Sequence, residues 1–83
     1  MRVRLSRQVI SLIYALREES AAITAVIELI RANPDQPDAI RTPDRRSRRE
    51  LLVKVGTRGY WMIYEIDRGG AETEILIATV DEN

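Results

Sequence analysis

The stretch VGTRGYWMIYEID, residues 55–67, decides the fold predicted for this chain. Two glycines bracket a turn at its start, and residues 60–66 then alternate between two sets of side chains, as the residues of a β-strand do. Residues 51–55, just before the turn, alternate in the same way. The two runs therefore predict a β-hairpin.

The hairpin carries the only Trp of the chain, Trp61. In a strand, Trp61 and Ile63 point to one face, whereas Tyr60, Met62 and Tyr64 point to the other. Both sets are apolar enough to form a core, so the pattern leaves open which set is buried. If Trp61 is exposed, it offers a stacking surface for a base or an anchor for a partner chain.

The residues after the hairpin predict a third strand. Residues 67–70 have turn composition, and residues 74–80 (EILIATV) are rich in β-branched side chains, as a central strand would be. The glycines of the turns precede no helix, so they do not indicate a phosphate-binding loop.

The residues before the hairpin predict a short strand and two helices. Residues 2–5 alternate as a strand, and Ser6 is a candidate N-cap. Apolar residues then recur at helical spacing over 7–17 and again over 20–30, until Asn33-Pro34 stops the pattern. This order predicts a helix hairpin that breaks near Glu18-Glu19-Ser20.

Residues 33–49 contain all three prolines, each with an Asp next to it, and the segment is therefore interpreted as a long surface loop. It holds the densest charge cluster of the chain, Arg41, Arg45, Arg46, Arg48 and Arg49. These guanidinium groups could bind phosphates or an acidic partner segment, or they could keep an edge strand soluble.

The predicted architecture is a single α+β domain, residues 1–83. The helix hairpin covers one face of a three-stranded meander, because neither layer can bury its apolar side alone. With residues 2–5 as an edge strand, the sheet becomes four-stranded and mostly antiparallel, and its other face stays open.

Composition excludes several classes of site. The chain has no Cys and no His, so disulfides, zinc sites and His-based catalysis are excluded, and no cofactor or metal is expected. No apolar run is long enough for a membrane span and no signal peptide is evident, so a cytoplasmic protein is expected. Charge is segregated: residues 1–49 hold ten Arg against six acids, and residues 50–83 hold three cations against seven acids.

The chain resembles the RelE/ParE superfamily of bacterial type II toxins. The resemblance covers most of the chain: a short first strand, a helix hairpin closed by Ala32-Asn33-Pro34, a polar loop, a strand ending Val55-Gly56, and a strand containing IYEID at 63–67. It implies a growth-inhibiting toxin, of a kind associated with plasmid stabilisation, that binds a cognate antitoxin. RelE-like members cleave mRNA on the ribosome, and ParE-like members poison DNA gyrase.

Two departures bear on function. Aligned on Tyr64, the position of the family's Arg falls on Trp61, and the chain ends in acidic residues rather than basic or aromatic ones. Of the basic residues that RelE-like cleavage uses, only Lys54 and Arg58 are matched. RNA cleavage also needs a base, and an ordinary Lys or Arg stays protonated at neutral pH.

We therefore expect a ParE-like toxin that acts by macromolecular binding. The binding residues expected are Arg41, Arg45, Arg46, Arg48, Arg49, Trp61 and Tyr64. The alternatives are an RNA-binding, ribosome-dependent mRNA endonuclease with Lys54 and Arg58 as catalytic residues, and an inactive toxin-fold protein that survives as a binding or dimerising module. The expected partners are an antitoxin and either gyrase or the ribosome with its mRNA, with a homodimer as a further expectation.

Overall fold

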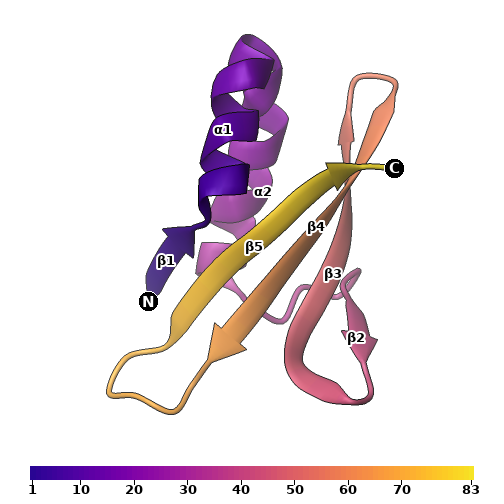
Figure 1. Ribbon diagram of the computed structural model, residues 1–83. Helices are drawn as coiled ribbons and strands as arrows, with labels where there is room; N and C mark the ends of the chain where they lie inside the picture. The colour runs from indigo at the N-terminus through magenta and orange to yellow at the C-terminus, as the bar shows by residue number, and fades with distance from the viewer.

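The computed structural model describes residues 1–83 and shows two helices packed on one face of a five-stranded mixed sheet (Figure 1). In chain order the elements are β1 (Arg2–Leu5), α1 (Arg7–Leu16), the 3₁₀ turn η1 (Arg17–Glu19), α2 (Ser20–Ala32), β2 (Ile40–Thr42), β3 (Arg45–Val55), β4 (Arg58–Asp67) and β5 (Glu74–Glu82).

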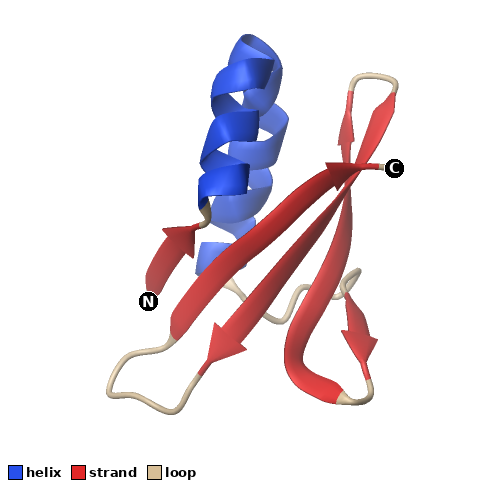
Figure 2. Cartoon of the chain, in the orientation of Figure 1, coloured by secondary structure: helices blue, strands red, loops and turns tan.

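The strands lie in the order β1-β5-β4-β3-β2. Neighbouring pairs are antiparallel except β1 and β5, which are parallel and join the two ends of the chain. Both helices lie on the same side of the sheet (Figure 2). The opposite side of the sheet, which we call the open face, has no element over it.

The helical segment is almost continuous, because α1, η1 and α2 follow one another without an intervening residue. Ser6 caps α1: its Oγ accepts a hydrogen bond from the Val9 amide at 3.3 Å. Arg17 ends α1 with a φ of 53°, and the chain then reverses so that α2 runs back behind α1 (Figure 1). At the end of α2, the Gln36 side chain donates to the carbonyls of Leu29 and Asn33.

The predicted hairpin of β3 and β4 forms, but its turn is shorter than predicted: it consists of Gly56 and Thr57, and Gly59 lies within β4. Gly56 has a φ of 64°, and it is the first central residue of the turn, as in a type II′ hairpin. This turn type suits the twist of the flanking strands, so Gly56 helps to fix the register of the pair.

The helices and the sheet enclose one core. Its buried apolar residues are Val9, Ile23, Ile27, Ile30, Leu51, Val53, Val55, Tyr60, Met62, Tyr64, Ile66, Ile75, Ile77 and Val80. The alternation along β4 is thereby settled: Tyr60, Met62 and Tyr64 face the helices, so Trp61 and Ile63 lie on the open face.

The predicted α+β class is confirmed, but two details of the prediction are wrong. The sheet has five strands rather than three or four, and residues 33–49 are not one long loop, because they contain β2 and the first half of β3. Four of the five arginines of this segment are paired with acidic side chains, as described below, which helps them to lie in strands. None of the helices is long and apolar enough to cross a bilayer.

Candidate functional site

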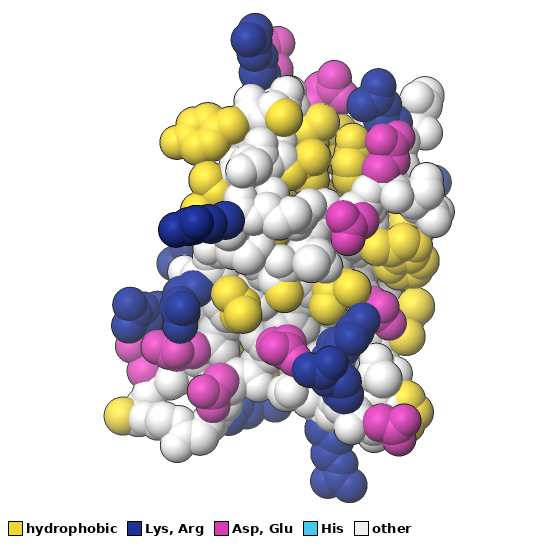
Figure 3. All heavy atoms as spheres, viewed as in Figure 1, with side chains coloured by type: hydrophobic (Ala, Val, Ile, Leu, Met, Phe, Trp, Pro, Cys, Tyr) yellow, Lys and Arg dark blue, Asp and Glu magenta, His cyan; other side chains and the backbone are white.

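The open face carries a mixed set of apolar and charged side chains. Its residues on the three central strands include Arg48, Glu50, Leu52 and Lys54 of β3, Trp61, Ile63 and Glu65 of β4, and Leu76, Thr79 and Asp81 of β5. All of them are at least partly exposed. Acidic and basic side chains are mixed over much of the lower half of the molecule as viewed in Figure 3.

A hollow of about 300 Å³ lies on the open face at a β-bulge of β5, where Ala78 is the extra residue between Ile77 and Thr79. Its lining residues are Arg45, Arg48, Ile63, Glu65, Ala78 and Thr79. Two polar atoms at this hollow, Arg48 Nε and Thr79 Oγ1, are buried and have no hydrogen-bond partner. A buried polar atom without a partner is costly, so these two atoms weaken the local packing of β3 and β5.

A second hollow of about 350 Å³ adjoins the first and shares Glu65 with it. It extends the depression across β4 and β5 to Arg4 on β1. Its remaining charged residues are Asp67 and Glu74. The depression therefore presents both signs of charge over an apolar floor, which suits a polypeptide better than a uniformly anionic ligand.

Trp61 lies half-buried on the open face, opposite Leu52 on β3 and Asp81 on β5. Its Nε1 donates a hydrogen bond to Asn83 Oδ1 at 3.3 Å. Leu52, on the neighbouring strand, is 42% exposed. Trp61, Ile63 and Leu52 therefore form an apolar stripe across two strands, with the polar hollow at one end.

The five arginines predicted as one binding cluster are divided between the two sides of the sheet. Arg45 and Arg48 belong to the open face, where Arg45 pairs with Glu65 at 3.1 Å and Arg48 with Glu50 at 3.4 Å. Arg46 is exposed and makes no ion pair. The five arginines therefore do not form one cluster in the structure.

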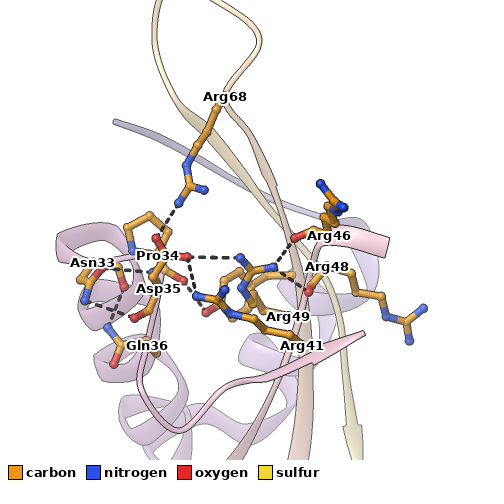
Figure 4. Close-up of polar contacts among 10 residues, drawn as sticks. Asn33, Pro34, Asp35, Gln36, Arg41, Arg46, Arg48, Arg49 and Arg68 are labelled. Atoms are coloured by element: carbon orange, nitrogen blue, oxygen red, sulfur yellow. Dashed lines mark hydrogen bonds and ion pairs between the residues drawn. The ribbon is translucent and has the colours of Figure 1, made fainter. Parts of the chain in front are cut away.

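Arg41 and Arg49 lie on the helix side and converge on Asp35, together with Arg68 (Figure 4). The distances to the Asp35 carboxylate are 3.2 Å from Arg49, 2.7 Å from Arg68 and 3.8 Å from Arg41. We call these four residues the Asp35 cluster. It holds the segment after α2 against the start of β3 and the turn after β4.

Arg49 is the buried member of the Asp35 cluster, at 5% exposure. Its Nη1 also donates to the backbone carbonyls of Arg46 and Arg48, while its Nε has no partner. A buried guanidinium needs such compensation, because an unpaired buried charge is strongly destabilising. Arg49 therefore has a structural role and is not available to an external ligand.

The Asp35 carboxylate stays ionised to unusually low pH. Burial on its own would raise the pKa of Asp35, but the hydrogen bond from Arg49 and the charge and hydrogen bond of Arg68 outweigh it. The net effect lowers the pKa below its ordinary value of 3.8. The cluster is thus intact at neutral pH.

Lys54 and Arg58, the two residues matched to RelE-like catalysis, lie on opposite faces of the hairpin. Lys54 pairs with Gly59 and has the parity of the open face, whereas Arg58 pairs with Val55, a core residue. A hydrogen bond with Tyr60 and the nearby charge of Glu82 raise the pKa of Arg58, so it stays a cation. The two cations therefore leave the hairpin on opposite faces of the sheet.

Tyr64, predicted as a binding residue, is fully buried on the helix side. Its hydroxyl donates to the Pro34 carbonyl at 2.7 Å. Burial raises the pKa of Tyr64, which keeps the hydroxyl protonated and able to donate. Tyr64 therefore anchors the chain after α2 and does not meet a ligand.

Two contributors were missed at the sequence level: Asp35 and Thr79. Asp35 stands in a Pro-rich segment, where an acidic residue usually marks a turn. Thr79 lies at the hollow because β5 has a bulge next to it, and no pattern in the sequence predicts this bulge.

Comparison of the chain with known protein families, curated proteins and solved structures finds no match.

Proposed function

We propose that this protein acts by binding another macromolecule through the open face of its sheet, as the ParE-like toxin of a type II toxin–antitoxin system. Its target would be DNA gyrase in the bacterial cytoplasm, and a cognate antitoxin would neutralise it. The observation that supports the binding proposal is the stripe of Trp61, Ile63 and Leu52 beside a hollow that is lined by charged side chains.

The stripe has the features of a protein-binding hot spot. A Trp at the centre of a flat apolar surface contributes much of the binding energy when a partner covers it, and charged residues at the rim set orientation. Arg48, Glu50 and Glu65 supply such a rim. The order of helices and strands is compatible with the toxin family that the sequence resembles.

The geometry favours binding over RNA cleavage. Lys54 and Arg58 lie on opposite faces, and the nearest acid to the open-face hollow, Glu65, is already paired with Arg45. A general base must reach the proton it removes and must be free to accept it. The open face provides no such free base beside Lys54.

The proposal is tested by expressing the protein from an inducible promoter in bacteria and following growth, cellular mRNA and DNA damage response together. We expect growth arrest with intact mRNA and with induction of the DNA damage response. Purified protein should inhibit DNA supercoiling by gyrase. Cleavage of mRNA at codon positions, or the absence of arrest, would contradict the proposal.

Trp61→Ala tests whether the open face does the binding. We expect the loss of growth arrest and a weakening of target affinity of about 30-fold, which corresponds to about 2 kcal/mol for a central Trp. Tyr14→Ala is the matched control, because Tyr14 is an aromatic residue on α1 that is 78% exposed. If both variants behave alike, the open face is not the binding surface. Circular dichroism of each variant checks that the fold is retained.

A further inference from the structure

The outer edge of β3 is only half covered. β2 pairs with β3 from Arg45 to Glu50 and no further, since Ile40 lies opposite Glu50 at the start of β2. Residues 51–55 therefore have β4 on one side and no strand on the other (Figure 1). Such an edge presents unpaired backbone groups that a further strand can bond.

The turn determines which backbone groups point outward. In a hairpin with a two-residue turn the closing pair, here Val55 and Arg58, exchanges hydrogen bonds, and bonded pairs then alternate with non-bonded pairs. Leu52 and Lys54 belong to the non-bonded pairs, so their N–H and C=O groups point away from β4. In agreement, the carbonyl of Gly59, opposite Lys54, points the other way and accepts from the Asn83 amide at 2.7 Å.

The part of β5 that extends beyond β1 is bonded by side chains, unlike the uncovered part of β3. Beyond the end of β1, the side chain of Gln8 exchanges two hydrogen bonds with the Val80 backbone, at 2.7 Å and 2.9 Å. Ser6 Oγ donates to the Ala78 carbonyl at 2.7 Å. No side chain does the same for Leu52 or Lys54.

We propose that a second copy of this chain pairs with this edge, so that two β3 strands run antiparallel about a two-fold axis at Val53. Leu52 of each copy then lies opposite Lys54 of the other. This register forms four backbone hydrogen bonds and uses every outward group of the two residues in both copies. The two sheets join into one, and both open faces remain free.

The neighbouring registers form fewer backbone hydrogen bonds, because each keeps only one pair of outward-facing residues. An axis at Leu52 would bring Lys54 of the second copy opposite Glu50, where Ile40 is already paired. An axis at Lys54 would place Leu52 opposite Gly56, which lies in the turn. The axis at Val53 places residues 51–55 of the two copies opposite one another, and the turn of each copy then meets Ile40 of the other at the start of β2.

Side chains along the edge are complementary to a second copy. In the proposed register, Lys54 of one copy lies diagonally across from both Glu50 and Lys54 of the other, so two Lys–Glu contacts form beside one Lys–Lys contact. Glu50 also pairs with Arg48 of its own chain at 3.4 Å. Lys54 makes no ion pair within its own chain. Leu52 and Ile40, at 42% and 51% exposure, are the most exposed large apolar residues of the sheet, and both lie beside this edge.

A charge swap tests the register, with the oligomeric state measured by sedimentation over a range of concentrations at an ionic strength of about 0.1 M. Lys54→Glu and Glu50→Lys should each weaken the dimer about tenfold, and the double variant should restore it, because opposite charges again face each other. Within one chain the two residues are about 13 Å apart along the strand, beyond the screening length of about 10 Å, so rescue can arise only between copies. Failure of rescue would overturn the proposed register.

Amide hydrogen exchange of the unmodified chain tests the edge without any substitution. The amides of Leu52 and Lys54 should exchange more slowly as the protein concentration rises, whereas the Val53 amide, bonded to β4, should be protected throughout. A protein that stays monomeric at millimolar concentration would overturn the inference. So would a dimer in which these two amides stay unprotected, and so would an edge that is protected only when a separate extended peptide is added. None of these measurements depends on toxicity or on gyrase.

Discussion

At the scale of single residues, Asp35 connects the segment after α2 to β2, β3 and the turn after β4. Its carboxylate pairs with Arg41, Arg49 and Arg68, and Arg49 is buried. Removing the negative charge leaves a buried guanidinium without its counter-ion, and a cost of about 2 kcal/mol is typical of such a loss. The cluster thus links Asp35, in the segment after α2, to Arg49 on β3.

We predict that Asp35→Asn lowers the free energy of unfolding by about 2 kcal/mol at neutral pH. The folded-state pKa of Asp35 is lowered, so its contribution is complete above the ordinary value of 3.8 and disappears as the pH falls through the folded value. The difference between the two proteins should therefore be constant at neutral pH and shrink in strong acid. Urea denaturation at several pH values measures it. Asp38→Asn, at an exposed and unpaired Asp, is the control and should change little.

The same residues show why the sequence predicted the site only in part. The face on which Trp61 lies could not be predicted, because both sets of alternating side chains on β4 are apolar and either could pack against the helices. In the structure, Tyr60, Met62 and Tyr64 are the buried set. Arg49 looked like a solvated loop residue, and only the distant Asp35 makes its burial possible. Alternation is a local signal, whereas burial of a charge depends on a partner far away in the chain.

At the scale of elements, the junction between α1 and α2 contains a residue, Arg17, in a backbone conformation that residues other than glycine rarely adopt. Arg17 ends α1 with a φ of 53° and a ψ of −117°, and it is the only non-glycine residue with positive φ. A side chain is strained in this region, whereas glycine adopts it freely. The helix break itself was predictable near this point from the change in apolar pattern, but the strained residue was not.

Arg17→Gly should raise the free energy of unfolding by about 1 kcal/mol, because it removes the strain at the end of α1. Arg17→Ala keeps the Cβ atom and should give no such gain, so it is the matched control. Chemical denaturation of the three proteins gives the comparison. A glycine variant no more stable than the alanine variant would show that the junction is not strained.

At the scale of the whole molecule, the parallel pair of β1 and β5 ties the first residues of the chain to the last strand. Both helices lie between these strands in sequence, and both bury their apolar faces on the same sheet. The helix patterns and the strands from Leu51 onward were sufficient to predict the α+β class. The five-stranded order was not predictable, because β2 is three residues long and its pairing depends on the Asp35 cluster.

Because one core serves both layers, the helices and the sheet should unfold together. Trp61 fluorescence reports on the open face of the sheet, and far-ultraviolet circular dichroism reports mainly on α1 and α2. We predict that the two signals give the same midpoint in urea, as expected for a two-state transition of a small domain. At a concentration where the protein is dimeric, both midpoints should rise together, since only the folded chain presents the β3 edge. A separate, earlier loss of the circular dichroism signal would mean that the helices are not held by the sheet, and that the open face can persist without them.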